Sequence, residues 1–157
     1  MNVKHRIDDA DDFLIRPEAY VSEIFGDAYV GGWSAAEHWG LVHDASRAIH
    51  VMTASPREDT EVEGIRFKVQ AVPEKLFFGF ARAGGDKRGW QVSDLEKTLV
   101  DCILYPAMAG GRAQVEEIIE EYSIHPERDL ARLLKYSMKA GEARLGKAVD
   151  AILKGEE

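Results

Sequence analysis

The sequence lacks the features that mark membrane, secreted and disulfide-stapled proteins. Cys102 is its only cysteine, so no disulfide can form within the chain and no cysteine-based zinc site is available. No run of about 18 apolar residues occurs, which excludes a membrane-spanning helix. The polar residues 1–12 have no apolar core of a secretory signal. We therefore expect a cytoplasmic protein that folds without a disulfide, a metal ion or a cofactor.

A basic excess is also missing. The 157 residues include 20 Lys and Arg against 28 Asp and Glu, a net charge of −8. This balance argues against a general nucleic-acid binder, because neutralising phosphates requires a clustered basic surface. Half of the acidic excess lies in residues 1–27, which hold 3 basic and 7 acidic residues. The rest of the chain is nearly balanced and can still carry a local basic face.

Catalytic motifs are absent as well. There is no GxSxG elbow and no phosphate-binding GxxxxGK[ST] loop. A restriction-type nuclease would need a carboxylate two residues before Lys68, where Arg66 stands. His38 and His43 are five residues apart, which is not the spacing of the HExxH zinc helix, so we expect His38 to be partly buried and His43 to lie in a surface loop. We assign no catalytic, cofactor-binding or metal-binding residue. We expect Cys102 to lie in the core. Of the functions considered, an unrecognised metal-dependent hydrolase is the least favoured.

The order of the predicted elements favours an α+β fold. Short N-terminal helices come first, then a small mixed or antiparallel sheet, then a C-terminal helical bundle. The length suits a single domain over residues 1–157. We divide it into a polar acidic N-terminal segment (1–14), a helix and strand part (15–92) and a helical part (93–154).

In the first part, Pro and Gly residues bound the predicted elements. Apolar and polar residues alternate over 65–72, which places Arg66 and Lys68 on the solvent-exposed, basic face of a strand. A turn near Gly84 and Gly89 predicts a hairpin with a partly basic tip. The predicted helices cover 16–25 and 33–39, and the predicted strands cover 48–53, 61–62, 65–72, 76–80 and 90–92.

The second part shows helical spacing of apolar residues. Ser93 and Glu96 form a capping-box pattern, which predicts a helix that starts at Ser93 and ends before Pro106. A second helix follows the glycine pair 110–111, and we expect a third to begin at Pro126. A fourth helix closes the chain after Gly141. The third helix carries an apolar stripe of Leu130, Leu133, Leu134 and Met138.

Three segments with characteristic spacing follow one another along the chain, within 29–41, 64–79 and 92–101. Together they resemble the signature of AbiEi-type antitoxins, the transcriptional regulators of abortive-infection, viral-defence toxin–antitoxin systems. The likeness extends in order from about residue 15 to about residue 153, although Gly31 and Gly32 replace a serine-containing pair and Ala36 replaces a leucine. The signature residues are Tyr29, Trp33, Ser34, Ala35, His38, Gly40, Leu41, Phe77, Phe78, Gly79, Asp94, Glu96, Lys97 and Asp101.

The resemblance implies the C-terminal antitoxin domain of that family. Such a domain counteracts a nucleotidyltransferase-like toxin without forming a stable complex with it, and it supports repression through a separate DNA-binding domain. Because only about 15 residues precede the matched region, we expect no winged helix-turn-helix and no DNA binding except through a separate domain. The resemblance thus implies a non-enzymatic antitoxin whose signature residues are mostly structural.

The alternative from the residues themselves is a nucleic-acid-binding accessory or transcriptional regulator. It rests on a basic patch that would form if the strand near residue 66 and the hairpin tip are neighbours. The candidate partner or nucleic-acid contacts are Arg66, Lys68, Arg82, Lys87 and Arg88.

Overall fold

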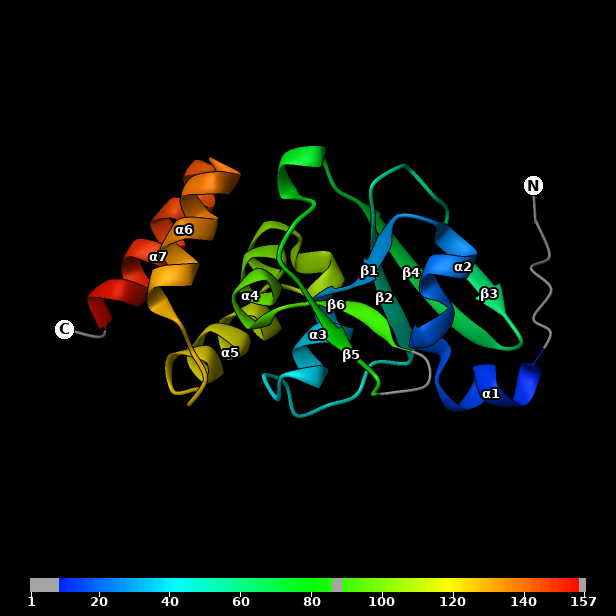
Figure 1. The fold of residues 1–157 in the computed structure, drawn as a ribbon. Helices are drawn as coiled ribbons and strands as arrows, with labels where there is room; N and C mark the ends of the chain where they lie inside the picture. Colours follow the sequence, from blue (N-terminus) through cyan, green and yellow to red (C-terminus); the bar gives the residue numbers. More distant parts are fainter. Residues whose placement is uncertain (1–8, 86–88, 156–157) are drawn as a thin grey trace.

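A computed structural model describes residues 9–85 and 89–155. These residues form a six-stranded mixed sheet in the order β3-β4-β2-β1-β6-β5, with helices on both faces (Figure 1). The expected α+β fold with C-terminal helices is confirmed. The strands are β1 (Ala28–Val30), β2 (Ala48–Thr53), β3 (Thr60–Val62), β4 (Ile65–Ala71), β5 (Phe80–Ala83) and β6 (Trp90–Ser93).

The short strand β1 lies in the middle of the sheet. It pairs antiparallel with β2 on one side and parallel with β6 on the other, where Val30 faces Val92. Next to it, β2 and β4 run parallel over six residue pairs. The predicted strand 48–53 is confirmed, and so is the break between the predicted strands 61–62 and 65–72, where Glu63 and Gly64 form a turn with positive φ.

The N-terminal residues pack more tightly than their charge suggested. The segment 1–14 was predicted to be a polar, acidic N-terminal segment, and in its described part Phe13 is completely buried and packs against the rings of Tyr20 and Phe67. The predicted helix 16–25 is divided at Tyr20 into a 3₁₀ turn and an α-helix. The elements are α1 (Ala10–Ile15), η1 (Pro17–Tyr20), α2 (Val21–Phe25) and, after β1, α3 (Gly32–His38).

The predicted strand 76–80 is wrong. Pro73 caps a 3₁₀ turn, η2 (Glu74–Leu76), and the chain then crosses to Phe80 through Gly79, whose φ of 79° breaks extended structure. Only Phe80 of this run enters the sheet, as the first residue of β5, and the residues before it pack without strand pairing. The rings of Phe77 and Phe80 pack on Tyr29, with centroids 5.5 and 4.7 Å from its ring.

The helical part follows β6. Its helix starts differ from the prediction, because Asp94 and not Ser93 caps α4, and Asp129 and not Pro126 begins α6. No helix in the described ranges combines the length and apolar composition needed to cross a bilayer. The elements are α4 (Leu95–Leu104), η3 (Pro106–Ala109), α5 (Arg112–Ser123), α6 (Leu130–Ala140) and α7 (Ala143–Gly155).

The predicted apolar stripe of α6 is only partly correct. Leu133 is buried, but Leu134 is 42% exposed and Met138 is 74% exposed. The helix instead turns Ser137 and Ala140 inward, because small side chains allow α6 to lie close to its neighbours.

The two faces of the sheet carry two separate cores. Tyr29 and Met52 point to one face, where α4 lies between the sheet and the outer helices α6 and α7 (Figure 1). Val30, Val51 and Phe67 point to the other face, which α1, η1 and α2 cover. Because side chains alternate along a strand, neighbouring residues of β1 serve different cores.

Candidate functional site

A buried cluster of polar side chains joins β1 to α4. The hydroxyl of Tyr29 donates to Asp101 Oδ2 at 2.6 Å, and Lys97 Nζ donates to the Tyr29 hydroxyl at 3.0 Å. Lys97 and Asp101, one helical turn apart, also form an ion pair. All three side chains are completely buried. The cluster links the first signature segment to the third.

Burial controls the protonation of this cluster. It raises the pKa of Asp101 and lowers the pKa of Lys97, while the attraction between the two groups opposes both shifts. Burial and the neighbouring Asp101 carboxylate also raise the pKa of Tyr29 well above its ordinary value. Because Lys97 and Asp101 neutralise each other, removal of either one leaves a buried charge without its counterion.

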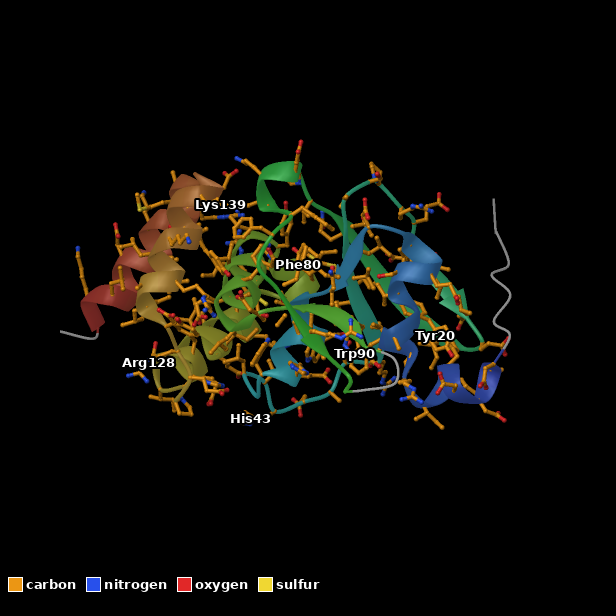
Figure 2. All side chains as sticks on the ribbon, viewed as in Figure 1. Tyr20, His43, Phe80, Trp90, Arg128 and Lys139 are labelled. Carbon is orange, nitrogen blue, oxygen red and sulfur yellow. The ribbon has the colours of Figure 1, made fainter. Side chains whose placement is uncertain are left out.

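The second signature segment closes over the same lysine. A Cβ atom added at Gly79 would lie 2.9 Å from Lys97 Cβ, so only glycine fits at this crossing. The Phe78 ring centroid is 5.1 Å from Lys97 Nζ and 4.3 Å from Lys139 Nζ. Phe80, the next aromatic residue along the chain, lies near the centre of the molecule (Figure 2). All three signature segments therefore meet around Lys97.

Two acidic signature residues fasten the helices to one another. Asp94 caps α4 by accepting from the Lys97 amide at 2.8 Å, and its other oxygen accepts from the Tyr136 hydroxyl at 2.5 Å. Glu96, which is buried, accepts from the Tyr122 hydroxyl at 2.8 Å and from the Asp129 amide at 2.9 Å. The predicted capping box is therefore wrong in its partners: Glu96 reaches α5 and α6.

The first signature segment shapes α3. Ala35 and Leu41 are completely buried, and Gly40, with φ of 74°, ends the helical turn. Trp33 Nε1 donates to the carbonyl of Asp44 at 2.8 Å. The hydroxyl of Ser34 accepts from the His50 amide at 2.8 Å, so it ties α3 to β2.

His38 and His43 do not converge on a common point. His38 is exposed at the end of α3, which corrects the expectation that it is partly buried. His43 is largely exposed, as expected, and projects from the edge of the molecule (Figure 2). Its Nε2 lies 3.6 Å from Glu121 Oε1. In residues 9–85 and 89–155, no group of three His, Cys, Asp or Glu side chains could hold a metal ion. Cys102 is buried in the core, as predicted.

The candidate basic residues that the structure describes lie in two separate places on the sheet. Arg66 and Lys68 are on β4, whereas Arg82 is on β5 at the opposite edge, and three strands separate the two. Lys87 and Arg88 lie outside the described residues. The condition for one basic patch, that the two strands are neighbours, is not met for the described residues.

Arg66 and Lys68 instead line a pocket on the face of the sheet that carries α3 and η3. The open pocket has a volume of about 390 Å³, and its lining includes Trp33, Arg47 and His50. Lys68 Nζ donates to the carbonyl of Ala107 in η3 at 3.0 Å. The parallel register pairs His50 with Lys68, which brings the two strands' polar residues to one place.

His50 and Arg47 carry no motif that would single them out in the sequence. His50 is buried, and burial together with the positive charge of Lys68 lowers its pKa to about 4, so the ring is neutral at pH 7. Its Nδ1 lies 3.3 Å from the Ser34 hydroxyl. Only the pairing of β2 with β4 could have pointed to these residues, and the sequence predicted both strands without their order.

The comparison with known families agrees with the geometry of the signature residues. The model of the AbiEi antitoxin C-terminal domain matches residues 29–151, which include all three segments that meet at Lys97. No curated protein matches the chain. The matched range also contains the pocket residues of α3, β2 and β4. The chain belongs to the family of AbiEi antitoxin C-terminal domains.

Proposed function

We propose that this chain is a non-enzymatic antitoxin that counteracts a nucleotidyltransferase-like toxin of a prokaryotic abortive-infection system, in the cytoplasm. The observation that carries the proposal is the family match over residues 29–151. The buried contacts of Tyr29, Lys97 and Asp101 support it, because they show that the signature residues serve one shared fold. We further propose that residues 1–157 act as a single domain, a view supported by the contacts of α4 with α3, β6 and the outer helices.

The mechanism we propose involves neither a catalytic group nor a stable complex with the toxin. Three charged signature side chains, Lys97, Asp101 and Glu96, are buried and hold one another or neighbouring helices. A buried, mutually paired group cannot reach a substrate without unfolding. The signature therefore maintains the fold, and the surface of that fold acts on the toxin or its targets.

Co-expression with the toxin tests this proposal. The chain is produced together with a nucleotidyltransferase-like toxin, and growth is followed after induction of the toxin. We expect growth to resume with the wild-type chain and with Lys75→Met, which alters an exposed ion pair with Glu142. The core variant Lys97→Met should rescue growth less well, in proportion to its folded fraction. Unrelieved arrest with a folded wild-type chain contradicts the proposal.

A second experiment tests the absence of a stable complex. Purified chain and toxin are mixed and separated by size-exclusion chromatography. Separate elution at concentrations that support rescue agrees with the proposal, whereas co-elution in a fixed ratio refutes this part of it.

The second candidate function is a nucleic-acid-binding accessory. It is supported by the side-by-side placement of Arg47, Arg66 and Lys68 around one pocket. Binding of labelled DNA and RNA at low salt tests it, and affinity should fall with rising salt as phosphate contacts are lost. Glu substitutions at Lys87 and Arg88 test whether these two residues contribute to binding. The substitution Arg66→Glu tests whether the pocket contributes to binding. If neither DNA nor RNA is retained at low salt, this function is excluded.

A further inference from the structure

The pocket between α3, β2 and β4 is locally positive, although the chain as a whole is negative. Arg47, Arg66 and Lys68 line it, although the whole chain carries a net charge of −8. Asp59 is the acidic side chain of the lining, and its Oδ1 already accepts from the Val69 amide at 2.8 Å. The cations therefore outnumber the one acid, and this field favours an anion.

The cations of the pocket are open to a ligand in different degrees. Arg47 and Arg66 are exposed and present planar guanidinium groups, which suit bidentate binding of phosphate. Lys68 is half-buried, and its contact with the Ala107 carbonyl holds the ammonium group in place while two of its three protons remain available. The pocket thus offers one hydrogen-bond donor that is held in place, Lys68, and two donors on exposed side chains, Arg47 and Arg66.

Two rings form a fixed wall beside these cations. The ring centroids of Trp33 and His50 are 6.0 Å apart and their planes are inclined by 35°. Trp33 is held by its hydrogen bond to the Asp44 carbonyl, and His50 is held by Ser34 through both its amide and Nδ1. The wall is therefore formed before any ligand arrives, so little ordering cost is left for binding.

We propose that this pocket binds a nucleotide, with the phosphates on Arg47, Arg66 and Lys68 and the base against the Trp33 side of the pocket. The combination of a cationic side and an aromatic side matches a molecule with an anionic end and a flat ring. The volume of about 390 Å³ lies within the range of small-molecule sites. This inference goes beyond the antitoxin function and does not depend on it.

Equilibrium dialysis of the full chain against labelled ATP and GTP tests the proposal. We expect saturable binding of at least one nucleotide to a single site, weakened by added salt. Arg66→Gln should weaken binding at least about tenfold, as expected when a charge-assisted hydrogen bond to phosphate is lost. The matched control is Arg82→Gln on β5, which makes the same change of charge with three strands between it and β4 and should leave binding unchanged. Both arginines are exposed, and circular dichroism checks that both variants fold.

Three further probes separate the two halves of the ligand. Tripolyphosphate carries only the anion, adenosine carries only the base and sugar, and Trp33→Phe trims the aromatic wall. The proposal expects both fragments to bind more weakly than the nucleotide, and expects Trp33→Phe to weaken the nucleotide more than tripolyphosphate.

Several outcomes would overturn the proposal. One is no saturable nucleotide binding by a folded chain, and another is equal loss of binding in Arg66→Gln and Arg82→Gln. Tripolyphosphate binding as tightly as the nucleotide would refute the part assigned to Trp33. Binding of single-stranded oligonucleotides but of no mononucleotide would replace the proposal with a nucleic-acid interface. Because none of these readouts involves the toxin, failure here leaves the rescue experiment unaffected.

Discussion

The substitution Lys97→Met tests the buried cluster most directly. Methionine keeps much of the aliphatic length of lysine, so packing against Gly79 and Phe78 is largely retained. The ammonium group is lost, and Asp101 is left with the Tyr29 hydroxyl as its remaining partner. Loss of one partner of a buried pair lowers the free energy of unfolding by about 3–5 kcal/mol. This is a large part of the roughly 5–15 kcal/mol that stabilises an ordinary domain.

Urea denaturation followed by circular dichroism measures the effect. The control is Lys75→Met, which breaks an ion pair at 2.6 Å between side chains that are 51% and 42% exposed. This control should change the free energy of unfolding very little, since water screens exposed pairs. The double variant Lys97→Met/Asp101→Asn should be more stable than Lys97→Met alone, because it no longer buries an unpaired charge.

The pH dependence gives an independent check. In Lys97→Met, burial raises the pKa of Asp101 in the folded state without the opposing lysine. A carboxyl whose folded pKa exceeds its unfolded pKa binds more protons when folded, so stability falls as pH rises through the folded pKa. The deficit of Lys97→Met relative to wild type should therefore shrink in acid. A loss equal to that of Lys75→Met, or a deficit that does not change with pH, would refute this account of the cluster.

Three other perturbations have defined outcomes. Gly79→Ala should lower the melting temperature, at a cost of roughly 1–3 kcal/mol, because its Cβ meets Lys97 and its φ is positive. Phe13→Ala should cost about 3–5 kcal/mol in denaturant titrations, whereas Leu14→Ala, at a site 49% exposed, should cost far less. His50, with its pKa lowered to about 4, should show no ring titration by NMR between pH 8 and pH 5. Because the unfolded state binds the His50 proton more tightly, stability should fall as pH drops from about 6.5 to about 4, and His50→Gln should reduce that slope.

The sequence predicted correctly those strands and turns whose conformation depends on neighbouring residues alone. The strand predicted over 65–72 follows from the alternation of its side chains, and the break before it follows from the positive φ at Glu63 and Gly64, which neighbouring residues determine. The strand prediction over 76–80 was wrong because apolar residues fill a core equally well outside a strand. The prediction that Met138 is buried was wrong because α6 packs through the small residues Ser137 and Ala140.

The site was less predictable than the fold, because its residues meet through long-range pairing. Helical spacing places Lys97 and Asp101 on one side of α4, but nothing local indicates that Tyr29 completes the cluster. The same limit applies to the pocket. Arg66 was a candidate from its strand alone, whereas His50 became visible only when β2 paired in parallel with β4.

The pairing of Val30 with Val92 has a consequence for synthesis of the chain. On the ribosome, β1 to β4 emerge first and can pair among themselves, but the sheet stays incomplete until β6 emerges much later. Until then the Tyr29 hydroxyl has no partner from α4. Lys97 and Asp101 follow within the next helical turns, and their spacing lets them pair while α4 is still in water. Lys97 and Asp101 therefore reach Tyr29 together, because one helix carries both charges.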